Sequence, residues 1–384
     1  MQDKIKNIVV ASVFSLFLVI FSVFCIKAYF NPNLHSDAEN RDLAQLPTDI
    51  TWEGIVDKTV INAFEDASTD QFPLREFFRE LKAKIQYNVL GLKENNGYVE
   101  KDGYICQIKN QFNMSGVNST FDKLSSLYNA QIAGKASNVY ISLIPDKNYY
   151  LGKDYGYPAP DFEALAEQYK QILPESTYID IFGDLELESF YKTDTHWDQS
   201  KILSVLEKLS SVMGFETSGN YTENKIEGFE GIYFDQSAMN PDSETLTYLT
   251  NDVINNLKVQ DVTTNKFIDV YAPNLFNEMH NYEIDGYNVF LSGKAGYPLL
   301  RIINPKATEN KTLVVFRDSY GSSIAPLIAE GYRTVYVVDL RSIDYKLLGE
   351  KTINGARNPF YIDFTDKDVL FLLSGLVIES GSFK

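Results

Sequence analysis

Two short motifs supply the residue types that nucleophilic acyl transfer requires. Residues 194–197 read Asp-Thr-His-Trp, and residues 317–321 read Arg-Asp-Ser-Tyr-Gly. A serine hydroxyl is a weak nucleophile until a neighbouring imidazole accepts its proton, and the imidazole needs a carboxylate that holds its tautomer and stabilises its charge. The motifs therefore predict Ser319 as the nucleophile, His196 as the general base and Asp194 as the orienting acid.

The sequence around Ser319 favours this interpretation. A continuous apolar run at residues 313–316 predicts a buried strand before it, and a helix is expected at about residues 322–330. Ligands of open α/β sheets bind at the carboxyl ends of strands. The start of the helix offers backbone N–H groups and a positive dipole to an oxyanion, and Gly321 permits a tight turn. The simpler alternative is that Asp318 and Ser319 only cap the helix.

The chain contains 3 His, so few residues can act as the base. In an extended segment, side chains two positions apart point to the same side, which lets the Asp194 carboxylate reach the His196 ring, and a loop can also bring the two together. A surface turn with an isolated histidine is the alternative, and Trp197 argues against it because a large aromatic side chain indicates a packed segment. A metal site at these residues is less well supported, because neither His35 nor His280 has a suitable ligand spacing.

Strands and helices are expected to alternate along most of the chain. Predicted strands lie at residues 139–144, 178–181, 313–316, 334–338 and 369–373, and predicted helices at about 59–90, 162–173, 199–213 and 322–330. Continuous apolar strands that alternate with helices indicate an α/β fold, with a parallel sheet covered by helices on both faces. Residues 215–300 contain short alternating runs, so a mostly β insertion is expected there.

The N-terminus predicts a membrane anchor. Residues 8–26 contain no charged side chain, and a helix needs about 20 apolar residues to cross a bilayer. Lys4 and Lys6 precede this run, so the positive-inside rule places the N-terminus in the cytoplasm and the rest of the chain outside. A cleaved signal peptide is the alternative, but no pattern of small residues closes the run. We therefore expect a membrane anchor at residues 1–30, a stalk at 31–50 and a catalytic domain at 51–384.

The composition narrows the class of substrate. The formal net charge of the 384 residues is −17, and an acidic body repels nucleic acid and other polyanions unless a basic patch intervenes. A neutral or weakly charged substrate is easier to reconcile with this charge. Of the 2 Cys, Cys25 lies in the predicted anchor and Cys106 outside it, so neither an internal disulfide nor a thiolate metal cluster is expected. No metal or other cofactor is predicted.

The motifs carry a resemblance to a known family. Residues 194–197 resemble the signature of the SGNH-hydrolase-like acetyltransferases of the alginate O-acetylation type and of the related DHHW proteins, and residues 317–321 resemble their nucleophile block. The Asp-x-His precedes the serine, as in that group and in contrast to ordinary SGNH esterases. Shorter matches are Glu-Asn-Arg at 39–41, Pro-Asp-Lys at 145–147 and Asp-x-Arg at 339–341. Thr195 departs from the first His of the DHHW name, and residues 215–300 match no motif of the group.

The resemblance implies a membrane-anchored, outward-facing enzyme with an SGNH-hydrolase-like fold that moves acetyl groups onto a polysaccharide. Its usual partner is a multispanning membrane-bound O-acyltransferase, which brings acetyl across the membrane. The candidates for contact with substrate or oxyanion near the nucleophile are Arg317, Tyr320, Gly321, Arg341 and Trp197. Further candidates to complete the oxyanion hole are Gly293 and Asn354.

Three functions remain open from the sequence. The first is transfer of acetyl groups to an extracellular or cell-wall polysaccharide through an acyl-serine. The second is an SGNH-type carbohydrate esterase or deacetylase, in which water instead of a sugar hydroxyl reaches the same intermediate. The third is a non-catalytic, glycan-binding assembly protein. What separates the first two is the exclusion of water, which a sequence does not reveal.

Overall fold

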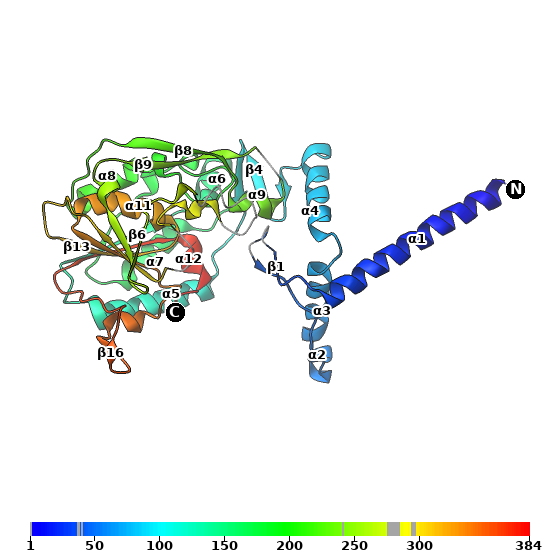
Figure 1. Ribbon diagram of the computed structural model, residues 1–384, viewed down its shortest axis with the longest axis horizontal. Coiled ribbons are helices and arrows are strands. Elements are labelled where there is room, and N and C mark those ends of the chain that lie inside the picture. The colour runs from blue at the N-terminus through cyan, green and yellow to red at the C-terminus, as the bar shows by residue number, and fades with distance from the viewer. Residues whose placement is uncertain (1, 37–38, 40, 240–241, 275–284, 293–296) are drawn as a thin grey trace. The chain divides into compact units, whose positions relative to one another are not determined.

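The computed structural model describes residues 2–36, 39, 41–239, 242–274, 285–292 and 297–384 (Figure 1). Asn40, His280 and Gly293, which the sequence analysis considered, lie outside these residues. The chain divides into two compact units: an N-terminal unit, Met1–Asn96 with Asp235–Asn240, and a sheet unit, Gly97–Phe234 with Pro241–Lys384. This division falls after Asn96, whereas the catalytic domain expected from the sequence begins at residue 51.

The N-terminal unit is mostly helical. Its elements are α1 (Gln2–Phe30), β1 (His35–Ser36), β2 (Arg41–Asp42), α2 (Trp52–Val56), α3 (Thr59–Asp70), α4 (Arg75–Lys84), a π-helical turn (Ile85–Val89) and β3 (Glu94–Asn95). Within α1, the segment Lys4–Phe30 has 27 residues and a mean hydropathy of 2.8, which makes it long and apolar enough to cross a membrane. The predicted apolar span is therefore present as one continuous helix.

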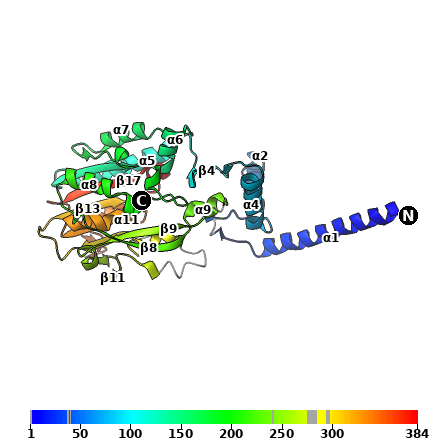
Figure 2. The same ribbon diagram turned by 90° about the horizontal axis from the view of Figure 1, so that it is seen from above.

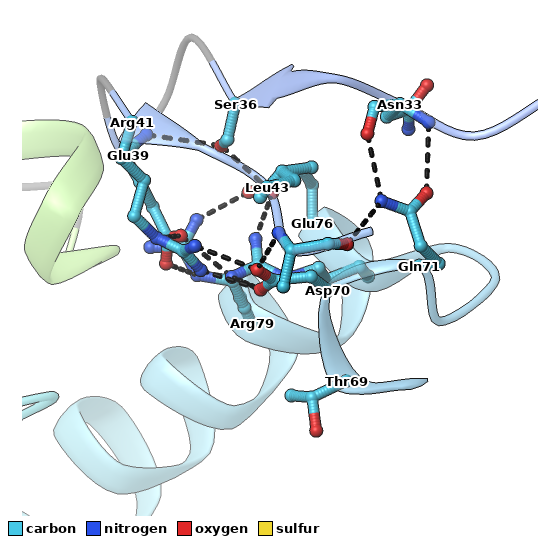
Figure 3. Close-up of polar contacts among 12 residues, drawn as sticks. Asn33, Ser36, Glu39, Arg41, Leu43, Thr69, Asp70, Gln71, Glu76 and Arg79 are labelled. Carbon is cyan, nitrogen blue, oxygen red and sulfur yellow. Dashed lines mark hydrogen bonds and ion pairs between the residues drawn. The ribbon is translucent and has the colours of Figure 1, made fainter. Parts of the chain in front are cut away.

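An ion-pair network joins the segment after α1 to α3 and α4 within this unit (Figure 3). Arg41 binds the Asp70 carboxylate through two hydrogen bonds, with Nη2–Oδ1 at 2.6 Å and Nη1–Oδ2 at 2.8 Å. Arg75 Nη2 and Arg79 Nε lie 2.7 Å and 3.1 Å from the two oxygens of Glu39. The Glu and the Arg of the motif at 39–41 therefore fasten the chain that follows α1 to the helices of the unit.

We predict that Asp70→Asn destabilises the N-terminal unit. The hydrogen bond from Arg41 lowers the pKa of Asp70 below its ordinary value. The ionised carboxylate thus stabilises the folded unit at neutral pH, and this stabilisation is lost as the pH falls through the lowered pKa. Removing the charge should cost about 1.5–3 kcal/mol at neutral pH, the range for hydrogen bonds to charged groups. Limited proteolysis of the detergent-solubilised chain, scored on cleavage within residues 31–96, measures the change.

Glu80→Gln is the matched control, because Glu80 forms an exposed ion pair with Lys84 at 3.4 Å, and such pairs contribute about 0–1 kcal/mol. The difference between Asp70→Asn and the parent chain should shrink as the pH falls below about 4, the ordinary pKa of an aspartic acid. Equal protease sensitivity of the two variants at neutral pH would show that the network does not hold the unit together.

The sheet unit contains alternating strands and helices. Its elements are β4 (Tyr98–Lys101), β5 (Tyr104–Gln107), α5 (Met114–Leu127), β6 (Asn138–Ile144), α6 (Lys147–Tyr155), α7 (Phe162–Ile172), β7 (Thr177–Tyr178), α8 (Leu203–Met213), β8 (Thr222–Phe229), β9 (Glu244–Thr250), β10 (Lys258–Asp261), β11 (Lys266–Ile268), β12 (Leu299–Ile303), β13 (Thr312–Arg317), α11 (Tyr320–Ile328), β14 (Thr334–Val338), β15 (Thr352–Ile353), β16 (Ala356–Arg357), β17 (Asp368–Ser374) and α12 (Gly375–Ser380). α9 (Ile232–Ser237) crosses the division between the units.

An eight-stranded mixed sheet forms the centre of this unit, in the order β11-β10-β12-β14-β13-β17-β6-β7. The strands from β14 to β7 are parallel to one another, which confirms the predicted α/β fold. β12, β10 and β11 extend the sheet in antiparallel pairing. These added strands come largely from the predicted β-rich insertion, which also contributes the separate antiparallel hairpin of β8 and β9.

Side chains of the central strands alternate between two buried layers. In β13, Leu313 and Val315 face the core beneath α8 and α11, whereas Val314 and Phe316 face the core beneath α5 and α7, and all four are fully buried. Figure 1 shows α11 on one side of the strands of the sheet and α5 on the other, and Figure 2 gives the view of the same ribbon from above. Because both faces are covered, the middle positions of β13 and β17 are all apolar, which is why they read as unbroken apolar runs in the sequence.

Candidate active site

Ser319 lies at the carboxyl end of β13, immediately before α11. Asp318 fixes this turn: its Oδ1 accepts a hydrogen bond from the backbone N–H of Tyr320 at 3.0 Å, and its Oδ2 accepts one from that of Ser374, at the end of β17, at 2.7 Å. The Ser319 side chain makes no capping hydrogen bond to α11. Asp318 therefore caps the helix, and the Ser319 hydroxyl is left for another partner.

Asp194 and His196 lie on a bent loop. The backbone N–H of Tyr191 donates to the carbonyl oxygen of His196 at 3.0 Å and closes the loop. The Glu244 carboxylate, in β9, accepts the backbone N–H groups of residues 192 and 193, each at 2.7 Å. The segment is thus bent where the sequence analysis considered an extended one, and contacts with the insertion hold it in place.

A continuous hydrogen-bond chain runs from Asp194 through His196 to Ser319. Asp194 Oδ1 lies 2.5 Å from His196 Nδ1, and His196 Nε2 lies 2.7 Å from Ser319 Oγ. Asp194 is completely buried, His196 is 4% exposed and Ser319 is partly exposed. The two sequence motifs therefore meet at one point, where the serine is the most accessible of the three side chains.

Electrostatics determine where the protons lie in this chain. Burial by itself raises the pKa of Asp194. This effect is outweighed by the charge and the hydrogen bond of His196 and by the backbone N–H groups of His196 and Ile232. The pKa of Asp194 therefore lies below its ordinary value. An ionised carboxylate only accepts hydrogen bonds, so His196 Nδ1 carries a proton, and Nε2 is an acceptor in the neutral form of the ring. Ser319 Oγ then donates to Nε2, which is the geometry by which a general base activates a hydroxyl.

Gly231 supports the carboxylate and was missed by the sequence analysis. Its backbone N–H donates to Thr193 Oγ1 at 2.9 Å, and the next N–H, that of Ile232, donates to Asp194 Oδ2 at 3.0 Å. A Cβ atom at residue 231 would lie 2.3 Å from Asp194 Cβ, so only glycine allows this close approach. This close approach lets the Ile232 N–H donate to the second oxygen of the buried Asp194 carboxylate.

Tyr287 covers one face of the His196 ring and was also missed. The two rings are parallel to within 7°, with centroids 3.8 Å apart, and Tyr287 Oη donates to Ser323 Oγ in α11 at 2.7 Å. Asp285 accepts the backbone N–H of Tyr287 at 2.9 Å and caps the short turn that carries it. Burial, together with the charge of Asp194, raises the pKa of Asp285 to about 6. The insertion thus contributes an aromatic wall that restricts the plane of the imidazole.

Trp197 and Tyr320 lie behind the hydrogen-bond chain. Trp197 is completely buried, and its indole N–H donates to Ser323 Oγ at 2.8 Å and to the Tyr320 carbonyl oxygen at 3.1 Å. Tyr320 is 1% exposed, and its hydroxyl donates to the Thr195 carbonyl oxygen at 2.6 Å. Burial therefore corrects their prediction as substrate contacts: both side chains hold the two motifs against each other.

Arg317 is buried beside the nucleophile turn. Arg341 binds Asp339 at 2.9 Å and 2.7 Å, and Arg317 Nη1 lies 3.4 Å from Asp339 Oδ2. A Cβ atom at Gly321 would lie 2.4 Å from Arg317 Cβ, so Gly321 makes room for the arginine side chain. Arg317 Nε is buried without a hydrogen-bond partner among the described residues. Two residues before Ser319, the guanidinium of Arg317 thus keeps one N–H donor, at Nε, that no described residue accepts.

The expected oxyanion donors at the start of α11 are already occupied. The backbone N–H groups of residues 320–322 donate to Asp318 Oδ1, Asp318 O and Ser319 O, each at 3.0 Å. Asn354 lies in the exposed turn between β15 and β16, and Gly293 lies outside the described residues. In the part of the chain that the structure describes, no group of three or more His, Cys, Asp or Glu is placed to hold a metal ion.

We predict that the stacked ring of Tyr287 is needed for acyl transfer to and from Ser319. Tyr287→Leu should lower kcat for an activated acetyl ester by about tenfold to a hundredfold, because a small misplacement of the base is costly. Tyr287→Phe keeps the ring and should retain most of kcat, and KM should change little in either variant. Steady-state kinetics on the parent chain and the two variants measure kcat and KM separately. Equal losses in both variants would indicate that the hydroxyl, and not the ring, is what matters.

Comparisons with known proteins support the fold. No protein-family model matches the sequence, and no curated protein sequence matches it at a significant level. A DHHW family protein from Eubacterium siraeum superposes with a TM-score of 0.55 at 20% identity, over 76% of this chain and 94% of that one. PatB1 from Bacillus cereus superposes with a TM-score of 0.52 at 15% identity, over 75% of this chain and 99% of that one.

A second structure of Bacillus cereus PatB1, with a sulfonyl adduct, has a TM-score of 0.50 at 16% identity, over 75% of this chain and 98% of that one. At these identities the likeness shows a shared fold. The resemblance to DHHW proteins that the motifs indicated is confirmed at that level.

Proposed function

We propose that this protein is a membrane-anchored, extracytoplasmic O-acetyltransferase that moves acetyl groups onto an extracellular or cell-wall polysaccharide. The observation that carries the proposal is the unbroken hydrogen-bond chain from the buried Asp194 carboxylate through His196 to the partly exposed Ser319 hydroxyl. The resemblance of both motifs to polysaccharide O-acetyltransferases and the fold shared with a DHHW family protein support this choice of reaction.

In the first half-reaction, Ser319 Oγ attacks the carbonyl carbon of an acetyl ester while His196 Nε2 accepts the hydroxyl proton. The Oγ–C bond forms, the carbonyl π electrons move onto oxygen, and the imidazolium is stabilised by Asp194. The bond from this carbon to the donor alkoxide then breaks, and His196 returns the proton to the leaving oxygen. The products are acetyl-Ser319 and the free donor alcohol.

In the second half-reaction, His196 Nε2 accepts the proton of a sugar hydroxyl, and the sugar oxygen attacks the acetyl-Ser319 carbonyl. A second oxyanion forms and collapses, the bond to Ser319 Oγ breaks, and the serine regains its proton from His196. Attack by water at this stage releases acetate, which is the esterase or deacetylase outcome. Both reactions use the same intermediate and differ only in the acceptor that reaches it.

Arg317 is the donor that we assign to the oxyanion. The first N–H groups of α11 are engaged, and Arg317 Nε is a buried donor without a partner among the described residues. A cationic donor held in a buried site is stabilising where negative charge develops in the transition state. Arg341 supports this role by sharing the Asp339 carboxylate with Arg317.

The N-terminal helix is proposed to anchor the enzyme, with its short N-terminus in the cytoplasm and the sheet unit outside. Lys4 and Lys6 precede the apolar part of α1, as the positive-inside rule requires. A single helix provides no path for acetyl groups across the membrane. We therefore propose that a multispanning membrane-bound O-acyltransferase supplies acetyl, as the family resemblance implies.

We predict that Ser319→Ala lowers acetate release from an activated acetyl ester, such as 4-nitrophenyl acetate, by several orders of magnitude. Ser211→Ala is the matched control, because Ser211 is exposed on α8. A sulfonyl fluoride reacts with activated serines and should label the parent chain and the control at Ser319, but leave Ser319→Ala unmodified. Full activity of Ser319→Ala would remove the nucleophile assignment, whereas no acetate release by the parent chain would favour the non-catalytic, glycan-binding alternative.

We predict that protease added to intact cells digests the sheet unit and leaves an N-terminal tag in front of Lys4 protected. The physical reason is that Lys4 and Lys6 stay on the cytoplasmic side, so the body of the chain lies outside. Immunoblots for tags at both ends measure this outcome, and permeabilised cells provide the control in which both tags are lost. Protection of the sheet unit in intact cells would show the reverse orientation.

A further inference from the structure

We propose that the acceptor glycan lies in a groove at the carboxyl edge of β17 and β6, and that the sugars it accepts there are uncharged. The groove is lined by side-chain amides of the segment before α5 and of α7. This inference rests on the proposed function, because it names the acceptor of that reaction.

Two adjoining hollows form the groove. One has a volume of about 430 Å³ and is lined by residues that include Asn110, Gln111 and Gln168. The other has a volume of about 520 Å³, shares Gln111 with the first, and is bordered by Leu376 at the start of α12. Together they have room for several sugar rings, which fits a polymer better than a small alcohol.

The groove lies on the same edge of the sheet as the nucleophile. α12 begins directly after β17, the strand that pairs in parallel with β13, and β6 is the next strand along. Neighbouring strands lie about 5 Å apart, so β6 lies roughly 10 Å along the sheet from β13, the strand that leads to Ser319. Carboxyl ends of strands are where open α/β sheets bind their ligands. The topology therefore places the groove and the nucleophile at the same edge of the sheet.

A third hollow, of about 10 Å³ and so with room for about one water molecule, adjoins both the groove and the active-site loop. It is lined by Lys109 and Leu376, which also border the groove, and by Asn148 and Tyr233. The Tyr233 hydroxyl donates to Thr195 Oγ1 at 3.0 Å, directly beside His196. Asn148 is 4% exposed, and its Oδ1 has no hydrogen-bond partner among the described residues. A buried acceptor of this kind is costly unless a ligand or water satisfies it.

The chemistry of the groove matches sugar hydroxyls. Asn110, Gln111 and Gln168 are exposed, and their side-chain amides make no hydrogen bond to any described part of the chain. Each amide offers both donors and acceptors, as a sugar hydroxyl does. The amides can therefore pair with hydroxyl or N-acetyl groups without a change in protonation.

The charges of the groove argue against uronic acids. Lys109 is the cationic residue among those that line the two hollows, and its ammonium is already paired with Glu379 in a short contact. Asp161, at the start of α7, adds a negative charge. A polyuronate would meet net negative charge here, in a protein whose formal net charge is −17. Neutral or N-acetylated sugars avoid this repulsion.

The segment that lines the groove is held rigidly. Glu379 Oε2 accepts the backbone N–H of Asn113 at 3.2 Å, and the same carboxylate is paired with Lys109. Asn148 Nδ2 donates to the Lys109 carbonyl oxygen at 3.2 Å. Hydrogen bonds and an ion pair thus connect the segment of residues 109–113 to α12 and α6. Binding a glycan to a surface that is already ordered avoids most of the entropy cost of ordering it.

The test measures binding and chemistry separately on the full-length chain in detergent. Cellohexaose, chitohexaose, mannohexaose and hexagalacturonate are the probes, and calorimetry with Ser319→Ala gives their affinities without turnover. We expect at least one neutral hexasaccharide to bind and hexagalacturonate not to bind. Adding Gln111→Ala and Gln168→Ala should weaken that binding by about tenfold, as the loss of two hydrogen bonds implies. Gln171→Ala, on the same helix but outside the groove, should leave binding unchanged.

The same glutamine substitutions in a chain with Ser319 should raise KM for the hexasaccharide as acetyl acceptor and leave acetate release from 4-nitrophenyl acetate unchanged. If acetate release is normal but the substitutions do not alter affinity or KM, the groove is wrong and the proposed function stands. If no acetyl-enzyme forms but the substitutions weaken binding, the proposed reaction is wrong and the groove stands as a glycan site. Preference for hexagalacturonate, or no binding of any neutral probe, would overturn the inference.

Discussion

The buried charge of Asp194 is the constraint on which the rest of the site depends. A carboxylate removed from water is stable only where donors surround it. Asp194 accepts hydrogen bonds from the backbone N–H of His196 at 2.9 Å, from its ring Nδ1 at 2.5 Å, and from the N–H of Ile232 at 3.0 Å. Gly231 is what allows the Ile232 donor to approach. The hydrogen bond that His196 Nδ1 donates to the Asp194 carboxylate therefore also orients the imidazole toward Ser319.

The nucleophile and the base are supported by different parts of the fold. Ser319 ends a fully covered central strand, and Asp318 joins its turn to β17. His196 lies on a loop that depends on β9 and on the Tyr287 ring, both from the segment at 215–300. The sheet thus sets the position of the nucleophile, whereas the insertion sets the orientation of the base. This explains how a segment without a recognisable motif comes to be part of the site.

Much of the sheet and the three residues of the hydrogen-bond chain were predictable from the sequence. The strand at 313–316 is buried on both faces, so its composition alone marks it. Gly231 and Tyr287 were not predictable, because each acts through one long-range contact that leaves no periodic signal. The first N–H groups of α11 are engaged for a local reason: that of residue 320 binds the Asp318 side chain, and those of residues 321 and 322 bind carbonyl oxygens of the same turn, a geometry that no sequence pattern specifies.

The central claim is that acetyl passes through Ser319. Its most direct test is rapid mixing of the full-length chain with 4-nitrophenyl acetate, an acid quench, and peptide mass spectrometry. The account predicts that the peptide containing Ser319 gains the mass of one acetyl group, with fragment ions that place it on Ser319, and that the modification decays when an acceptor is added. Consumption of the ester with no acetyl group on Ser319 at any time would contradict it.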